Sequence, residues 1–297
     1  MAVQRLLGAA WTAVHGPSDP ARLVRWLLEQ GMHGLVPGPA PRALGWRTIA
    51  DAADGLPIAF PAVRAGSILR QNAAVAGLAS GRESDQQTAR AAVVEAIGIA
   101  RALGARLVIL DPGLVPLMGE VGAEDLGDPS VRWTTERAQA MLARRKAGLS
   151  AALDRICRAL FDLCKHHHHI RFCLTPGGSI RTVAGIDGLE AIVEDLGSAR
   201  VGYWHDCAVA ARREQVLGEA QGQWLDRFSN LCDGCTLGDS GDDGMYLPPG
   251  AGGVDYPLLA AYLRRPHGTL AACLELDPGV DRAELPGVRA YLERFGL

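Results

Sequence analysis

The 297-residue sequence lacks any run of eighteen apolar residues, so it contains no candidate membrane-spanning helix. It also lacks a stripe of lysine or arginine, because 30 basic residues are set against 33 acidic ones and the formal net charge is −3. Duplex-binding proteins need clustered positive charge to displace phosphate counterions. We therefore expect neither a membrane nor nucleic acid among the partners of this protein.

Several common catalytic motifs are also missing. No G-x-G-x-x-G, Walker P-loop, G-x-S-x-G or H-E-x-x-H sequence occurs, so nucleotide-binding, serine hydrolase and zinc peptidase mechanisms have no support. The seven cysteines form an odd number without framework spacing, and most lie in apolar stretches where cysteine packs as a small hydrophobic residue. A reducing compartment fits this pattern better than a disulfide scaffold does, so we expect a cytoplasmic protein.

The sequence does contain eight short apolar runs, most of them followed by a helical stretch. Alternating strands and helices of this number predict an α/β fold, a closed (β/α)8 TIM barrel, which typically needs about 250 residues. No linker marks a second domain, so residues 1–297 are expected to form one barrel. The first run loosely imitates a signal peptide, but it is needed as the first strand. The runs are Leu6–Trp11, Gly34–Pro37, Pro57–Val63, Arg106–Leu110, Ile170–Leu174, Arg200–Trp204, Leu231–Leu237 and Leu270–Leu274.

Helix boundary signals agree with this alternation. Asp19 before a proline predicts a helix N-terminus, and Ser84 with Gln87 predicts a capping box ahead of a second helix. Gly104 is expected to end that helix. Residues 135–165 carry an apolar stripe at helical spacing, which predicts a long helix that packs on the sheet.

Polar residues close five of the apolar runs. In a closed parallel barrel the carboxyl ends of all strands meet around one mouth, so these side chains are predicted to converge on one pocket. Residues 64–83 and 112–134 are expected to be long loops on the same face, where they shape or cover the pocket. The closing residues are Asp111, Thr175, Asp206, Asp239 and Glu275.

Asp206 and Glu275 are the main candidates for chemistry, because a carboxylate has no packing reason to follow an apolar strand. Together they could hold a divalent cation or share proton transfer, whereas each alone could simply accept backbone or arginine hydrogen bonds. Asp239 is a further candidate, and the acidic residues after it are interpreted as a solvated turn. His205 precedes Asp206, so it is expected on the opposite face of the strand and is a weaker candidate for ligand contact.

Two other groups imitate metal or redox sites. His166–His169 follows a helix and precedes a strand, which places the four histidines at the rim opposite the convergent residues. Cys232 and Cys235 form a C-x-x-C inside a strand, where residues three apart are expected to face opposite sides. No second cysteine pair completes a zinc site, so packing is the favoured interpretation.

Five segments resemble the xylose-isomerase-like TIM barrels, a superfamily of sugar isomerases, keto-sugar epimerases, inosose dehydratases and apurinic endonucleases. Their order and spacing cover nearly the whole chain. The resemblance implies a TIM barrel of the sugar phosphate isomerase/epimerase type that acts on a small carbohydrate-like ligand. The segments are Glu95–Gly113, Val201–Asp206, Thr236–Asp239, Pro248–Asp255 and Leu274-Glu275.

The departures from this family concern its metal site. Thr175 stands where metal-binding members have a glutamate, and Tyr246 stands where a histidine is common. The usual D-x-x-H and H-x-x-D motifs also lack their histidines. Of the family's ligands only Asp206 and Glu275 remain, which implies one weakly held Mg²⁺, Mn²⁺, Co²⁺ or Zn²⁺, or no metal at all.

Three hypotheses follow. The first is an isomerase, epimerase or lyase in which Glu275 is the base and Asp206 a metal ligand, with the other mouth residues binding substrate. The second is a barrel without catalysis that binds a ligand or a protein partner. The third is a metal-free enzyme in which Arg64, Arg144 or Arg145 binds an anionic substrate, although the two helical arginines are expected to be solvated. The sequence is compatible with a homo-oligomer. The expected substrate-binding residues are Thr175, Asp239, Tyr246, Arg64, His205 and Asp111.

Overall fold

The computed structural model describes residues 2–40, 45–66, 77–117, 125–263 and 269–297. Eight parallel strands form one sheet, in the order β2-β1-β10-β7-β6-β5-β4-β3. After β7 the chain forms an antiparallel hairpin of β8 (Asp239–Gly241) and β9 (Gly244–Leu247). The sheet strands are β1 (Ala2–Gly8), β2 (Gly34–Val36), β3 (Ala62–Ala65), β4 (Leu107–Leu110), β5 (Arg171–Leu174), β6 (Val201–Asp206), β7 (Cys232–Leu237) and β10 (Thr269–Leu274).

Backbone hydrogen bonds join the two outermost strands, β2 and β3, and close the sheet into a barrel. The Ala59 N–H donates to the His33 carbonyl at 2.8 Å, and the Leu35 N–H donates to the Ala59 carbonyl at 3.2 Å. Further along, the Arg64 N–H donates to the Pro37 carbonyl at 2.7 Å. The predicted (β/α)8 TIM barrel is thereby confirmed.

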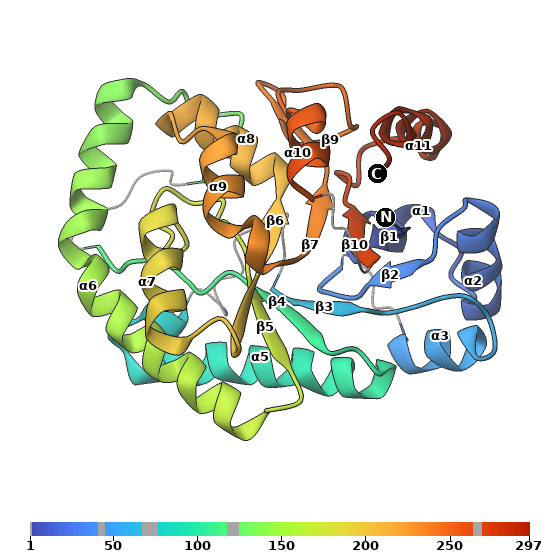
Figure 1. Ribbon diagram of the computed structural model, residues 1–297, viewed down its shortest axis with the longest axis horizontal. Helices are drawn as coiled ribbons and strands as arrows, with labels where there is room; N and C mark the ends of the chain where they lie inside the picture. The colour runs from blue at the N-terminus through green and yellow to red at the C-terminus, as the bar shows by residue number, and fades with distance from the viewer. Residues whose placement is uncertain (1, 41–44, 67–76, 118–124, 264–268) are drawn as a thin grey trace.

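Helices surround the strands on the outside of the barrel, with the long α5 and α6 spanning one side of the molecule (Figure 1). The two termini lie close together, and the Arg5 Nε donates to the Leu297 carbonyl at 3.3 Å. None of the described helices is long and apolar enough to cross a bilayer. The helices are α1 (Ala9–His15), α2 (Pro20–Glu29), α3 (Trp46–Ala53), α5 (Glu83–Leu103), α6 (Thr135–His166), α7 (Ile186–Leu196), α8 (Cys207–Leu217), α9 (Gln221–Phe228), α10 (Tyr256–Leu263) and α11 (Leu285–Glu293).

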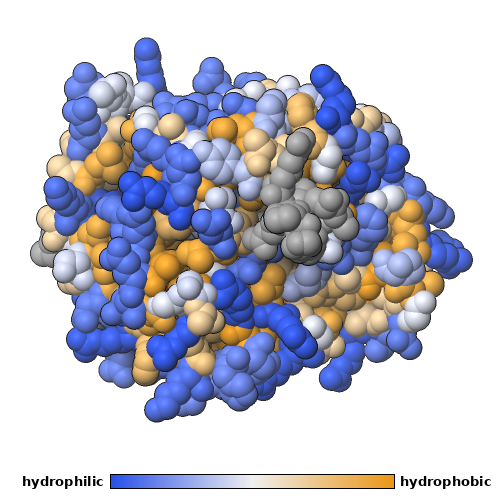
Figure 2. Space-filling view, viewed as in Figure 1, coloured by the Kyte–Doolittle hydropathy of each residue, from blue (hydrophilic) through white to orange (hydrophobic). Residues whose placement is uncertain are grey.

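The strands sort their side chains between two cores, because successive residues of a strand point to opposite faces. Outward residues such as Phe172 and Leu174 pack against the helices in the larger core. On the face seen in Figure 2, hydrophilic residues surround apolar ones that are visible nearer the centre. The smaller core fills the barrel interior with Leu6, Val36, Ala62, Ile109, Cys173, Trp204, Ala271 and Cys273.

Helix starts follow the sequence signals only in part. Asp19 caps α2 as predicted, since its carboxylate accepts from the Arg22 N–H at 2.8 Å. The predicted capping box of Ser84 and Gln87 is wrong, because α5 already begins at Glu83 without a side-chain cap. Gly104 ends α5 in the left-handed conformation, with φ 69°, as expected.

Three strand predictions need correction. The run Pro57–Val63 is part of a strand only from Ala62 onward, and this strand continues to Ala65. The run Leu6–Trp11 is strand only as far as Gly8, after which α1 begins, so Trp11 lies on a helix. Cys232 and Cys235 do not face opposite sides but pack in the same outer core. The cause is a bulge in β7, where the pairing with β6 shifts by one residue and reverses the alternation. Of the two predicted long loops, residues 67–76 and 118–124 lie outside the described residues.

Candidate functional site

The guanidinium of Arg64 lies inside the barrel mouth. Strand β3 points this side chain inward, and only 9% of it is exposed. Its Nη2 donates to the Thr236 hydroxyl at 2.7 Å and lies 4.0 Å from Asp206 Oδ2. The Trp204 indole also donates to the Thr236 hydroxyl, at 2.9 Å. The guanidinium of Arg64 therefore places a positive charge inside the mouth.

Asp206 ends β6 and is buried at 1% exposure. Its Oδ1 caps helix α8 by accepting from the Val209 N–H at 3.2 Å, and its Oδ2 accepts from the Tyr246 hydroxyl at 3.2 Å. Burial raises the pKa of this carboxyl, while the Arg64 charge and these hydrogen bonds oppose the rise. Asp206 therefore holds the start of α8 and the Tyr246 side chain in place at the mouth.

Glu275 directly follows β10 and is 3% exposed. The Trp11 backbone N–H hydrogen-bonds its carboxyl, but its Oε1 has no partner among the described residues. A Cβ built at Gly8 would lie 1.7 Å from its Oε2, so the absence of a side chain at position 8 makes room for the carboxyl. Burial raises its pKa to about 8, with the Asp206 charge adding to the rise and Arg64 opposing it. Glu275 is thus a buried carboxyl with a raised pKa and with one oxygen that has no hydrogen-bond partner among the described residues.

Thr175 and Asp111 follow β5 and β4 on the same inward alternation. Thr175 is 4% exposed, and its hydroxyl has no hydrogen-bond partner within the described part of the chain. Asp111 Oδ1 accepts from the Gly113 N–H at 3.0 Å and from the Thr182 hydroxyl at 3.3 Å. Burial raises the pKa of Asp111 to about 6, while the charges of Arg213 and Arg64 oppose the rise.

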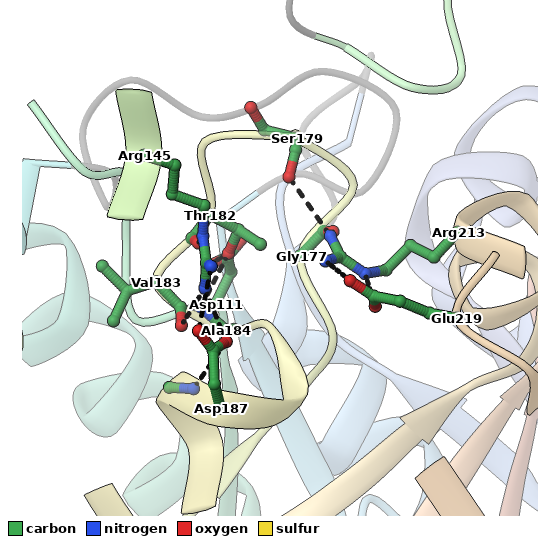
Figure 3. A network of polar contacts seen from close by, with 11 residues as sticks. Asp111, Arg145, Gly177, Ser179, Thr182, Val183, Ala184, Asp187, Arg213 and Glu219 are labelled. Atoms are coloured by element: carbon green, nitrogen blue, oxygen red, sulfur yellow. Dashed lines mark hydrogen bonds and ion pairs between the residues drawn. The ribbon is translucent and has the colours of Figure 1, made fainter. Parts of the chain in front are cut away.

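The loop between β5 and α7 is held by two buried arginines that approach it from opposite sides (Figure 3). Arg145 from α6 donates to the Thr182 carbonyl at 2.7 Å and pairs with Asp187 at 2.9 Å. Arg213 from α8 donates to the Gly177 carbonyl at 3.0 Å and is itself fully buried. The loop that begins at Thr175 and supports Asp111 is therefore a fixed part of the mouth.

The two helical arginines have different environments. Arg144 is exposed, as expected, with its Nη1 3.9 Å from Met141 Sδ. The expectation that Arg145 is solvated is wrong, because this side chain is only 5% exposed and bonds the loop carbonyls of Thr182 and Val183 and the Asp187 carboxylate of α7. Of the three arginines proposed to bind an anionic substrate, Arg64 is the one whose guanidinium lies in the mouth.

Asp239 and His205 have structural partners that leave them little part in the site. Asp239 is fully buried, and its carboxylate accepts from the backbone N–H groups of Ser240, Gly250 and Val254, each at 2.9 Å. It thereby ties the β8–β9 hairpin to the turn that follows. His205 points out of the barrel, as the alternation predicted, with its Nδ1 2.8 Å from the Tyr203 hydroxyl. Burial lowers the pKa of His205 to about 3, which keeps the ring neutral.

Tyr246 links the hairpin to the mouth. Its hydroxyl bonds Asp206, and it is 3% exposed. Its φ of 63° is a left-handed conformation, which costs a non-glycine residue about 1–2 kcal/mol. Beside it lies an open cleft of about 660 Å³, also lined by Asp125, Met245 and Asp277. The side chain of Tyr246 therefore separates this cleft from the buried carboxyls.

The residues present do not fit a divalent cation. A metal on Asp206 Oδ2 would share this oxygen with Tyr246 and lie against the Arg64 guanidinium, which leaves Glu275 as the other carboxylate. Magnesium takes six ligands and structural zinc four. No group of three or more histidine, cysteine, aspartate or glutamate residues suitable for a metal occurs among the described residues. This holds for His166–His169, which lie between α6 and β5, away from the mouth.

Sequence reasoning missed two contributors to the mouth. In the sequence, Thr236 stood out only because it replaces the histidine of the H-x-x-D motif. In the structure, its hydroxyl accepts hydrogen bonds from Arg64 and from Trp204. Its inward position follows from the strand alternation once the bulge in β7 is known. Gly8 carries no chemical signal, and its role appears only where Glu275 packs against it.

Comparisons with known protein structures identify the fold. No family model and no curated protein sequence matches the chain. A D-tagatose 3-epimerase-like protein matches with TM-score 0.69 and 14% identity over 99% of this chain and 97% of that one. The 3-keto-D-glucoside 4-epimerase from E. coli matches with TM-score 0.67 and 13% identity over 98% and 99%. The IOLI protein, whose structure contains zinc, matches with TM-score 0.66 and 10% identity over 99% and 96%. The chain therefore has the fold of the xylose-isomerase-like TIM barrels, as the motifs predicted.

Proposed function

We propose that the protein is an isomerase or epimerase that moves a proton on a small carbohydrate-type ketose at the barrel mouth, without a bound divalent cation. The observation that carries this proposal is Glu275: a buried carboxyl with a free oxygen and a pKa of about 8. A group that titrates near neutral pH can both accept and return a proton.

Arg64 supplies the positive charge that such a reaction needs. Removing a proton beside a ketone moves negative charge onto the carbonyl oxygen, and a fixed cation in a buried site stabilises that charge. In the described structure Arg64 donates one hydrogen bond, to Thr236, so several of its five N–H donors are left for a ligand.

An uncharged polyhydroxy ligand suits the remaining groups. The Thr175 hydroxyl and Glu275 Oε1 are buried polar atoms that receive no hydrogen bond from the described residues, and a ligand hydroxyl can bond either one. An anionic ligand is disfavoured because Asp111 and Asp206 already surround Arg64. This ligand class agrees with the structural neighbours, which include a D-tagatose 3-epimerase-like protein and a 3-keto-D-glucoside 4-epimerase.

Two similar structures contain or were determined with D-tagatose and D-fructose, and a third is an L-ribulose 3-epimerase. The test uses D-fructose, D-tagatose and L-ribulose, here termed the ketose panel. Each is incubated with the protein in D₂O, and deuterium uptake beside the ketone is followed by NMR. We expect uptake that EDTA leaves unchanged and that Glu275→Gln lowers by about 100-fold or more. Glu29→Gln, an exposed residue of α2, is the matched control. Uptake that requires added metal, or no uptake from any member, contradicts the proposal.

A second candidate is a barrel that binds a carbohydrate without turning it over. It is favoured by Asp206, a family ligand position whose two oxygens are both used to cap α8 and to hold Tyr246. Saturation-transfer NMR distinguishes the two candidates, since binding of a panel ketose without deuterium uptake supports this one.

A further inference from the structure

The side chains at the barrel mouth are closed off from solvent. Each of the four assigned to it is more than nine-tenths buried: Arg64, Thr175, Asp206 and Glu275. The open cleft of about 660 Å³ lies just outside, and its volume falls within the range of small-molecule sites, about 300–1,000 Å³. A ligand can therefore enter the cleft directly, but it reaches the mouth only if part of the protein moves.

Tyr246 stands between the cleft and the mouth. It lines the cleft, and its hydroxyl donates at 3.2 Å to Asp206 Oδ2, the oxygen that lies 4.0 Å from the Arg64 guanidinium. Its ring also lies beside Gly238, where a built Cβ would be 3.3 Å from Tyr246 Cδ1 and 2.7 Å from the Glu275 carbonyl oxygen. The Tyr246 side chain is itself buried, so it forms the wall between the two spaces.

The backbone of Tyr246 is irregular. The pairing of β8 with β9 skips this residue, which makes it the extra residue of a β-bulge. Its φ of 63° is a conformation that one class of bulge reserves for glycine. Such strain persists only where surrounding contacts hold it, and it concentrates at ligand clamps and switch regions. Here the contacts that hold it include the bond to Asp206 and the Asp277 N–H, which donates to the Tyr246 carbonyl at 2.8 Å.

The β8–β9 hairpin is fixed at its base and open at its tip. Asp239 anchors the base through the three backbone N–H groups that its carboxylate accepts. At the tip, residues 242–243 are exposed, and a Cβ built at Gly244 would meet no atom within 4 Å. The tip can therefore shift, and carry Tyr246 with it, without disturbing the core of the barrel.

We propose that Tyr246 is a gate between the cleft and the mouth, which opens when the tip of the hairpin moves it away from Asp206. A ligand enters through the cleft, and the gate then closes and shields both the ligand and Glu275 from water. The gate controls access to the mouth whatever reaction takes place there.

A reversible disulfide beside Tyr246 tests the gate. A Cβ built at Gly127 would lie 3.0 Å from Met245 Cγ, which is close to the place that a cysteine sulfur would take at position 245. This spacing suits a disulfide, so Gly127→Cys/Met245→Cys should lock the hairpin to the neighbouring loop when oxidised and release it when reduced. The reduced double variant is the matched control. Met245→Cys alone, oxidised in the same way, controls for the native cysteines.

The first readout needs no ligand. The Trp204 indole N–H donates to Thr236 inside the mouth, whereas Trp224 is equally buried but lies in the outer core. Exchange of the two indole N–H groups in D₂O is followed by NMR, with the signals assigned from Trp204→Phe and Trp224→Phe. The lock should slow exchange at Trp204 by about 10-fold or more, and Tyr246→Gly should speed it by about 10-fold or more. Exchange at Trp224 should stay within about 2-fold in both cases. No change at Trp204, or equal changes at both tryptophans, overturns the gate.

The second readout uses the ketose panel. The lock should lower deuterium uptake by the ketose by about 10-fold or more, and reduction of the disulfide should restore it. Uptake that the lock leaves unchanged overturns the gate and leaves the proposed function standing. No uptake by the wild-type protein contradicts the proposed function, and the exchange at Trp204 then decides on the gate by itself.

Discussion

Glu275→Gln is the substitution that tests the electrostatics of the mouth most directly, because glutamine keeps the shape of the side chain and removes its titration. Burial, the charges of Arg64 of β3 and Asp206 of β6, and the Trp11 backbone N–H act on the pKa of Glu275. Folding raises the pKa of this carboxyl from 4.5 to about 8. The folded protein therefore binds the proton more tightly than the unfolded chain does.

The sign of the effect follows from this difference. The contribution of Glu275 to stability is fully present below pH 4.5 and is lost as the pH rises through 8. At about 1.4 kcal/mol per pKa unit, the wild-type protein should lose about 4 kcal/mol relative to Glu275→Gln between pH 5 and pH 9. Titrating groups that do not interact with Glu275 are shared by both proteins and cancel in the comparison.

Urea unfolding of both proteins at pH 5, 7 and 9 measures the free energy of unfolding directly. The free energy of unfolding of Glu275→Gln should increase relative to that of the wild type as the pH rises across this range. Glu29→Gln, at an exposed carboxylate, should follow the wild type at every pH. If the free energies of unfolding of Glu275→Gln and the wild type changed with pH in parallel, the inference that folding raises the pKa of a buried Glu275 would be refuted.

Further expectations concern the neighbours of this group. Tyr246→Phe should lower the free energy of unfolding by about 1.5–3 kcal/mol in urea, because the buried Asp206 oxygen loses its donor; an unchanged midpoint contradicts that bond. Arg64→Met should cost about 3–5 kcal/mol, since it leaves buried carboxylates without a cation, and equal stability of the variant would show that Arg64 is solvated. Arg145→Ala should cost about 3–5 kcal/mol in thermal unfolding and the exposed Arg144→Ala less than about 0.5, and the reverse order would contradict the loop contacts. Calorimetric titration with Mn²⁺ should give no binding heat, whereas a saturable one-site isotherm would show that the mouth accepts a metal despite Arg64.

The alternation of apolar runs was sufficient to predict the barrel because each strand, at two residues per repeat, must bury one face against helices and the other inside the barrel. The same alternation correctly placed Asp111, Thr175 and Glu275 on inward positions. It failed at Cys235, where a bulge shifts the register of β7 by one residue. A bulge depends on how two strands pair, and this pairing cannot be predicted from the sequence of either strand alone.

Side-chain partners were the part that the sequence could not predict. The sequence pattern predicted an exposed helical arginine at Arg145. In the structure, this side chain bonds the Thr182 carbonyl of a loop that lies 37 residues further along the chain. Asp239 was expected to be a free strand-end carboxylate, but the turn after β9 donates two N–H groups to it, from Gly250 and Val254, and Ser240 donates a third. In both cases the deciding atoms come from a segment whose path is set by long-range packing.

The sequence by itself determined the fold class and the set of polar residues at the strand ends, because both depend on local periodicity. Only the tertiary structure decided which of those residues are occupied and which are free. Arg64 meets Thr236 across 172 residues, and Glu275 fits beside Gly8 at the other end of the chain. Burial and contact geometry, which arise only when the barrel closes, turn one carboxyl into a helix cap and another into a group that can exchange a proton.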